Sequence, residues 1–343
     1  MRVILILSAG LTLMAGASQA QKVEFKAKDL KQCESAESPE QAIRSCTRLI
    51  SVGLTLSPVF YSRGRAYSKN GDYGRAILDF DQAIRLEPSN VAAVYERGWA
   101  HHDNGAYDLA IQDFDQAVNL KPDSSEPLYS RGTAYHDKGE YDRAIQDYDR
   151  AIQIKPDHAK AFHNRGNAYR DKGDYKRAIQ DYDHAIQIQP DYAKAFHNRG
   201  IAQFLQGQFA AAATDFAKHV DLTPHQRYPA IWLYIARARA GQNADEDLRE
   251  AKSLDVKSWP GPAVALYGGM LEPKKMPEAA ANSDGETQKG QLCEAHFFLG
   301  EYDLIHGFQD QAAGEFQAAA DICRTQHECS FIAKVELRRV PHP

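Results

Sequence analysis

The sequence repeats itself at a step of 34 residues through the middle of the chain. Each copy ends in a segment close to Asp-Tyr-x-x-Ala-Ile-Gln-Asp-Tyr-Asp-x-Ala-Ile-Gln-Ile-x-Pro. A period of this length is typical of stacked helix-turn-helix units, each of which buries its apolar side against its neighbours. The sequence therefore predicts an all-α solenoid of antiparallel helix pairs instead of a globular enzyme core. The marker glycines are Gly64, Gly98, Gly132, Gly166 and Gly200, and the closing prolines are Pro88, Pro122, Pro156, Pro190 and Pro224.

Counting the marker glycine as the eighth residue gives five repeats: 57–90, 91–124, 125–158, 159–192 and 193–226. In the repeat 159–192, Gly173 is expected to end the first helix in a left-handed cap, and Pro190 to end the second. Gly166 is small because two antiparallel helices must approach closely there. The second helix carries one apolar stripe at helical spacing. The stripe consists of Ala178, Ile179, Tyr182, Ala185 and Ile186.

The first residues of the chain have a different composition. Arg2 supplies a small positive region, an apolar run covers residues 3–14, and small residues (Ser18, Ala20) precede Gln21. This pattern predicts a signal peptide over 1–20 that is cleaved, which leaves a periplasmic or secreted protein without membrane insertion. The alternative is an uncleaved membrane anchor, for which the apolar run is short.

The overall charge excludes one class of partner. The formal net charge is −5, and charged residues make up 25% of an ordinary soluble composition. No block of lysines and arginines stands out, so we expect no binding to nucleic acid.

The repeats resemble the tetratricopeptide repeat family in their Gly, Tyr, Ala, aromatic, Ala and Pro positions. The resemblance covers about half the chain and implies a right-handed superhelix of antiparallel helix pairs. One departure is an arginine at the seventh position of every copy, where the family usually has leucine. Its recurrence favours a structural ion pair with the repeat's own aspartates, such as Asp181 or Asp183, over ligand binding. These arginines are Arg63, Arg97, Arg131, Arg165 and Arg199.

The flanking segments follow the repeat pattern more loosely. Residues 21–56 are expected to form a degenerate N-terminal capping hairpin, and 57–226 the five repeats. Residues 227–291 should hold a further hairpin and a Pro- and Gly-rich segment of short helices and loops. Residues 292–343 return to the repeat pattern as a C-terminal hairpin followed by a capping helix.

The five cysteines lie in the two terminal segments. Cys33 takes the place of the repeat's tyrosine and Cys46 that of its second-helix aromatic, two positions that face each other across a hairpin. We therefore predict a Cys33–Cys46 disulfide, with two buried thiols as the alternative. Cys293 and Cys323 are predicted to pair in the last hairpin, and a Cys323–Cys329 pair is the competing arrangement. Because five is odd, at least one thiol is left over or pairs with another molecule.

The first helices of such hairpins line a concave groove at about the second, fifth, ninth, twelfth and thirteenth positions of each repeat. Aromatic side chains there give a large contact area, and His, Asn and Arg offer hydrogen bonds to a peptide. We therefore predict a groove that binds partner proteins or peptides, aromatic towards its N-terminal end. The alternative is an ordinary repeat surface partly covered by the terminal segments. The groove residues are Tyr61, Arg65, Tyr95, Trp99, His102, Tyr129, Thr133, His136, Lys160, His163, Asn167, Arg170, Lys194 and His197.

Catalysis and metal binding have little support in the sequence. His101 and His102 are adjacent instead of four residues apart, and no cysteine is spaced as a paired CxxC site. No catalytic signature or phosphate-binding glycine loop is found. We therefore expect neither enzyme activity nor a cofactor. His163-Asn164-Arg165-Gly166-Asn167 matches part of the carboxylate clamp of some family members, but the full set of lysines is missing.

A second resemblance covers roughly residues 227–338. The layout is similar to that of the NlpI-type lipoproteins, which are homodimeric periplasmic scaffolds that bring murein hydrolases to a tail-specific protease. This chain departs from them in lacking the lipid-bearing cysteine and in its disulfide-capable ends. The residues that carry the resemblance are Trp232-Leu-Tyr, Trp259, Ala265-Leu-Tyr-Gly268, Glu294-Ala-x-Phe-Phe-Leu-Gly300, Gly307, Ala312 and Glu315-Phe316.

Two functions follow from these patterns. The first is a non-catalytic periplasmic scaffold or adaptor, which resembles the NlpI type in linking murein hydrolases to an envelope protease and in a possible homodimer. The second is a structural assembly factor for secretion or outer-membrane biogenesis, for which self-association matters more than peptide capture.

Overall fold

The computed structural model describes residues 28–35, 38–244, 247–248, 257–281, 285–322 and 328–340. The expected signal peptide and Cys323 lie outside these ranges. Most of residues 245–256, where the second helix of the hairpin expected within 227–291 would lie, is also outside them. The regular structure within the ranges is helical. None of these helices is long and apolar enough to cross a membrane. The chain divides into an N-terminal unit, residues 1–156, and a C-terminal unit, residues 157–343.

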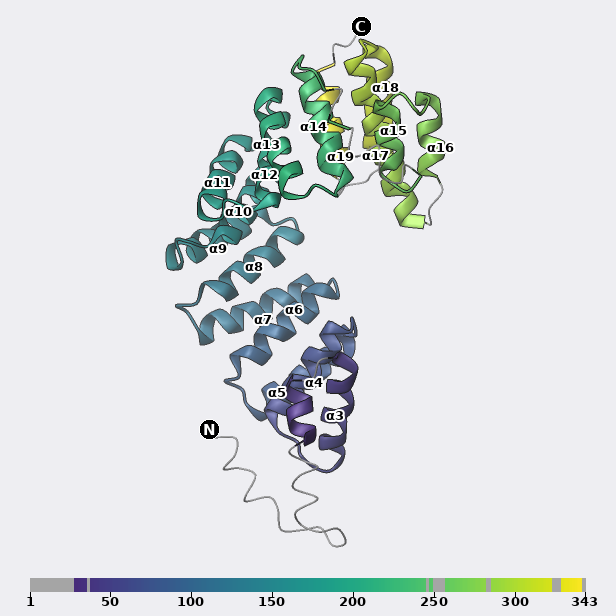
Figure 1. Ribbon diagram of the computed structural model, residues 1–343. Coiled ribbons are helices and arrows are strands. Elements are labelled where there is room, and N and C mark those ends of the chain that lie inside the picture. Colours follow the sequence, from purple (N-terminus) through teal and green to yellow (C-terminus); the bar gives the residue numbers. More distant parts are fainter. Residues whose placement is uncertain are drawn as a thin grey trace. The chain divides into compact units, whose positions relative to one another are not determined.

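The N-terminal unit is a stack of antiparallel helix pairs (Figure 1). A helical stretch over residues 28–35 precedes α3 (Pro39–Ser51), and these two make the first pair. The later pairs are α4 (Ser57–Lys69) with α5 (Tyr73–Leu86), α6 (Val91–Asp103) with α7 (Tyr107–Leu120), and α8 (Ser125–Asp137) with α9 (Tyr141–Ile154). Between successive pairs of this unit, α3 packs on α4, α5 on α6 and α7 on α8.

The C-terminal unit begins with the same kind of pairs and ends less regularly. Trp232 lies at its centre, with ring centroids 5.6 Å from Phe204, 5.7 Å from Phe216 and 5.4 Å from Phe297. The long α17 starts inside the range expected for short helices and loops. The helices are α10 (Ala159–Asp171), α11 (Tyr175–Ile188), α12 (Ala193–Leu205), α13 (Phe209–Leu222), α14 (Arg227–Arg239), α15 (Gly261–Tyr267), η2 (Pro273–Lys275), α16 (Met276–Ala280), α17 (Gly285–Ile305), α18 (Gln309–Ile322) and α19 (Glu328–Leu337).

The marker glycines allow the first helix of a pair to pack directly against the aromatic ring of the second helix. A Cβ placed on Gly166 would lie 2.7 Å from the ring of Tyr182, a side chain that is fully buried. The turn glycine Gly173 has φ +82°, the left-handed conformation expected for the end of the first helix. A side chain at Gly166 would clash with the ring, and one at Gly173 would strain the backbone. The same two requirements recur in the other repeats.

The seventh-position arginines form ion pairs, as the sequence predicted. Arg165 donates to Asp181 from Nε at 2.8 Å and from Nη2 at 2.5 Å, in the same repeat. The prediction of Asp183 as a partner within the repeat was wrong, because Asp183 binds Arg199 of the next repeat at 2.5 Å. Arg199 also binds its own Asp215 at 2.6 Å. Arg199 therefore joins two repeats. We call the seventh-position arginines with their aspartate partners the arginine ladder.

The arginine ladder also runs through the N-terminal unit. Each arginine lies about four-fifths buried, and its own-repeat aspartate is almost fully buried. The aspartate of the preceding repeat is about half exposed. The own-repeat pairs are Arg63–Asp79, Arg97–Asp113 and Arg131–Asp147, and the pairs with the preceding repeat are Arg97–Asp81 and Arg131–Asp115.

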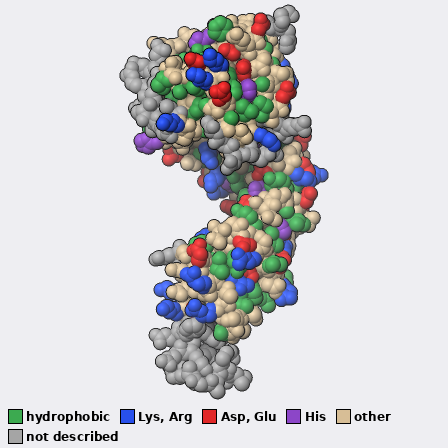
Figure 2. Space-filling model, turned by 90° about the vertical axis from the view of Figure 1, so that its right-hand side faces the viewer, with side chains coloured by type: hydrophobic (Ala, Val, Ile, Leu, Met, Phe, Trp, Pro, Cys, Tyr) green, Lys and Arg blue, Asp and Glu red, His purple; other side chains and the backbone are tan. Residues whose placement is uncertain are grey.

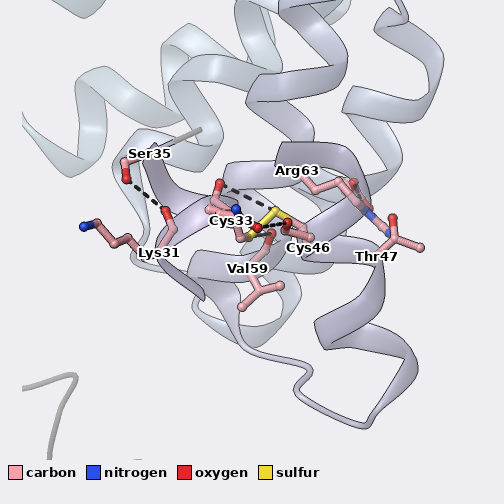
Figure 3. Close-up of a disulfide and its surroundings, with 10 residues drawn as sticks. Lys31, Cys33, Ser35, Cys46, Thr47, Val59 and Arg63 are labelled. Carbon is pink, nitrogen blue, oxygen red and sulfur yellow. Dashed lines mark hydrogen bonds and ion pairs between the residues drawn. A yellow bond between two sulfur atoms is a disulfide. The ribbon is translucent and has the colours of Figure 1, made fainter. Parts of the chain in front are cut away.

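The predicted disulfide closes the N-terminal pair. Cys33 and Cys46 are bonded, with their Cα atoms 4.8 Å apart, and both are buried beside Leu49 and Val59 (Figure 3). Cys293 is also buried and disulfide-bonded. Its pairing with Cys323 stays a prediction, because Cys323 lies outside the described residues.

Removing the Cys33–Cys46 bond is expected to lower the free energy of unfolding of the N-terminal unit. A loop of this size restricts the unfolded chain by about 3 kcal/mol. We expect the double change Cys33→Ala and Cys46→Ala to lower stability by about 2–4 kcal/mol, measured by denaturant titration with hydrogen exchange of α3. The matched control is Ser51→Ala at the exposed end of the same helix. An unchanged unfolding midpoint in the double variant would show that the bond adds no stability.

Candidate partner-binding face

The N-terminal unit presents three tyrosines in the same structural position. We call the surface formed by the outward side chains of α4, α6 and α8 the first-helix face. Each fifth-position tyrosine packs on the second-helix ring of its own repeat and stays partly exposed. The centroid distances are 6.1 Å for Tyr61–Phe80, 5.7 Å for Tyr95–Phe114 and 5.9 Å for Tyr129–Tyr148. Their orientation is therefore set by the core beneath them.

Trp99 makes an aromatic cluster in the middle of this face. Its ring lies 5.5 Å from Phe114, 6.4 Å from Tyr95 and 5.1 Å from His102, in edge-on geometry each time. Trp99 is partly exposed. An amphipathic ring held in place by its neighbours loses little entropy when a partner covers it. This cluster is therefore suited to anchor a bound segment.

Two histidines share one carboxylate beside Trp99. The Oδ2 atom of Asp137 lies 2.8 Å from Nε2 of His102, and its Oδ1 lies 3.2 Å from Nδ1 of His136. Burial works to lower the pKa of His102, but hydrogen bonds to Asp137 and Asp103 outweigh it and raise that pKa. Burial also works to raise the pKa of Asp137, and the two histidines outweigh it, so that pKa is held well below its usual range. Asp137 is therefore a carboxylate stabilised by this pair.

Hydrogen bonds to the next first helix and to the second helix of the same repeat hold other residues of the face. The hydroxyl of Tyr95 lies 2.9 Å from Oγ of Ser130, and Tyr148 donates to Thr133 at 3.3 Å. Arg65 is exposed and makes a long ion pair of 3.6 Å with Glu96. The face is thus largely pre-organised, which reduces the entropy cost of binding.

The C-terminal unit uses its predicted groove residues differently. Lys160 and Lys194 are exposed, whereas His163 is buried. The side-chain amide of Asn198 lies 3.0 Å from Nε2 of His163 and donates to Asn167 at 2.8 Å. Burial lowers the pKa of His163 to about 4, so its ring is neutral at neutral pH. His163 and Asn167 of the clamp-like segment are therefore both hydrogen-bonded to Asn198 of the next repeat.

Two further groove residues of the C-terminal unit also contact neighbours. Arg170 donates to Asp171 at 3.0 Å. The His197 ring lies 5.1 Å from that of His219 and 6.4 Å from that of Trp232. His197 therefore packs into the aromatic centre of the unit.

Sequence reasoning missed the residues that connect the first helices. Ser130 and Asn198 occupy the sixth position of their repeats, and Asp137 the thirteenth. Each lies 35 residues after its partner Tyr95, His163 or His102. A search for polar pairs at one residue more than the repeat period could have found them. Among the described residues, no group of three or more His, Cys, Asp or Glu side chains is placed to hold a metal ion.

Comparison with protein families identifies the repeat. A model described as tetratricopeptide repeat matches residues 61–127, and a second, described as TPR repeat, matches 132–169 and 166–207. The central part of this chain is a tetratricopeptide repeat array. Tetratricopeptide repeats mediate contacts between proteins, and their scaffold is generally non-catalytic. The sequence matches no curated protein.

Solved tetratricopeptide repeat structures agree with the fold. PilW, a type IV pilus biogenesis factor, is 20% identical with a TM-score of 0.54, over 61% of this chain and 97% of that chain. A tetratricopeptide repeat protein from Parabacteroides merdae is 17% identical with a TM-score of 0.53, over 81% and 98%. MamA is 27% identical with a TM-score of 0.44, over 47% and 94%. The first two show that the all-α repeat fold is shared.

Proposed function

We propose that this chain is a non-catalytic adaptor of the periplasm that holds other envelope proteins on the first-helix face of its N-terminal unit. The observation that carries the proposal is the row of partly exposed aromatic side chains, Tyr61, Tyr95, Trp99 and Tyr129, each packed against a buried ring or another aromatic. Rigid aromatic anchors are the usual source of binding energy at protein interfaces.

The clients follow from the sequence of the two ends of the chain. The signal-like segment directs the adaptor to the periplasm, and the NlpI-like layout of the C-terminal part points to murein hydrolases and a tail-specific protease. In that arrangement the adaptor brings the hydrolase to the protease. The same layout gives a homodimer, which light scattering of the purified protein tests.

Replacing the aromatic anchors is expected to weaken capture of these clients from periplasmic extract. Tyr95→Ala with Trp99→Ala should reduce recovery of the murein hydrolase or protease about thirtyfold, because a hot-spot aromatic contributes at least about 2 kcal/mol. Recovery is measured by affinity capture and quantitative mass spectrometry. Trp99→Leu, which leaves a large apolar side chain at this position, serves as a second variant that should also reduce recovery, and circular dichroism checks that both variants fold.

The matched control is Leu78→Ala with Leu109→Ala, two exposed aliphatic side chains on the second helices α5 and α7. These changes remove a comparable apolar area from outside the first-helix face and should leave capture unchanged. If the aromatic variants recovered as much client as the unchanged protein, the binding surface would lie elsewhere. Recovery of secretion or assembly components in place of hydrolase and protease would favour the assembly-factor function.

A further inference from the structure

A small pocket opens between the capping pair and the first repeat of the N-terminal unit. Its volume is about 130 Å³, room for several waters. Three buried side chains line it: Cys33 from the helical stretch 28–35, Ala42 from α3 and Ala66 from α4. The pocket is therefore walled by the two segments that the Cys33–Cys46 disulfide joins and by α4.

The charged lining of the pocket consists of two cations and one carboxylate, beside the polar Ser38 and Ser62. Arg65 and Lys69, one helical turn apart on α4, are both exposed and both line it. One carboxylate, that of Glu34, also lines the pocket. Lys and Arg side chains gather over this N-terminal end of the molecule on the face shown in Figure 2. The first residue of α3, Pro39, also lines the pocket, and the start of a helix adds to the preference for negative charge.

Arg65 connects this pocket to the first-helix face. Its guanidinium lies 5.7 Å from the ring centroid of Tyr61, and its ion pair with Glu96 is long, at 3.6 Å. An arginine has five N–H donors in a planar fork, so one distant carboxylate leaves donors for a second. A segment that lies along Tyr95 and Tyr61 would reach the pocket at its end.

We infer that this pocket receives an acidic side chain, a glutamate or aspartate, of the partner segment that follows the first-helix face. The methylene groups of a glutamate would cover Cys33, Ala42 and Ala66, and its carboxylate would lie between Arg65 and Lys69. Charge-assisted hydrogen bonds to arginine are stronger than neutral ones and specify the ligand geometrically. The inference rests on the proposed function, since it takes that face as the path of the partner.

The test uses a probe that needs no known partner. The full chain is labelled with ¹³C at alanine methyl groups and titrated with N-acetyl-glutamate N-methylamide, whose one carboxylate is the side chain. We expect saturable shifts of the Ala42 and Ala66 methyl signals, with Ala263 in the C-terminal unit as the reference. The matched probe N-acetyl-glutamine N-methylamide has the same shape without the charge and should bind at least tenfold more weakly.

The variant Arg65→Gln with Lys69→Gln should weaken binding of the glutamate probe at least tenfold, and Lys121→Gln, an exposed control, should not change it. Equal shifts with both probes, or unchanged binding in the double variant, would overturn the inference. Binding of N-acetylglycine without binding of the glutamate probe would overturn it in favour of a chain-terminal carboxylate. Failure of client capture with intact probe binding would count against the proposed function alone.

Discussion

Replacing Arg131 by methionine is expected to destabilise the N-terminal unit by about 3–5 kcal/mol, because breaking a buried ion pair leaves a charge without its partner. Arg131 donates to Asp147 through two nitrogens, at 2.7 and 2.5 Å, and to Asp115 at 2.5 Å. Only 5% of the Asp147 side chain is exposed, so water cannot replace the guanidinium. The loss is measured by denaturant titration, with hydrogen exchange of α8 and α9 to place it in the structure.

The control for this prediction lies in the same helix pair. Arg143→Met removes an exposed arginine whose partner is Glu140, three residues earlier in the sequence, and should cost less than about 1 kcal/mol. Adding Asp147→Asn to Arg131→Met should restore part of the stability, because the buried charge is then removed. If Arg131→Met were as mild as Arg143→Met, the arginine ladder would have no role in joining the repeats.

The arginine ladder also shows which contacts the repeat pattern in the sequence can predict and which it cannot. A period of 34 residues was sufficient to predict the helix pairs, the marker glycines and the pairing of Arg165 with Asp181, because these depend on contacts within one repeat. The partner of Asp183 depends on how one repeat rotates against the next. The sequence of a single repeat does not encode that rotation. Asp183 was therefore expected to pair within its own repeat, whereas it binds Arg199 of the next one.

The candidate face was predicted in outline for a similar reason. Residue type and position indicated that Tyr95 and Trp99 point outwards, and both are partly exposed. The fifth position, which holds Tyr95 in the second repeat, holds His163 in the fourth repeat, and His163 is buried. A histidine is short enough to lie against Tyr182 and Tyr192, with ring centroids 5.7 and 5.0 Å away. Helical position alone therefore does not distinguish an anchor from a packed ring.

The C-terminal unit contains a buried cluster of charged side chains that the sequence analysis did not predict. Arg239 donates to Glu301 at 2.6 Å and to Glu336 at 3.0 Å. Both carboxylates are fully buried, and they come from α17 and α19. Arg339 also binds Glu336 and donates to the carbonyl of Phe204 at 3.2 Å, near the end of α12. Their separations of 62 and 97 residues follow no repeat, so only folding brings these charges together.

Replacing Arg239 by methionine is expected to destabilise the C-terminal unit by about 3–5 kcal/mol at pH 8.5, because buried Glu301 then loses the arginine that binds it and buried Glu336 keeps only Arg339. The matched control is Arg338→Met, an exposed arginine beside Arg339, which should change stability by less than about 0.5 kcal/mol. Denaturant titration gives the free energy of unfolding, and hydrogen exchange of α14, α17 and α19 shows where protection is lost. A loss in the range of the control would mean that the buried carboxylates are stabilised by other groups.

The pH dependence of that loss identifies its electrostatic origin. Burial raises the pKa of Glu301 from 4.5 to about 7, and Arg239 acts to lower it. Because the folded-state pKa is the higher one, the contribution of Glu301 to stability is complete below about pH 4.5 and is lost as the pH rises through 7. Without Arg239 the folded-state pKa rises further, so the penalty for ionising the carboxyl grows. The destabilisation by Arg239→Met should therefore be smaller at pH 5.5 than at pH 8.5, whereas a loss that came only from missing side-chain packing would be the same at both.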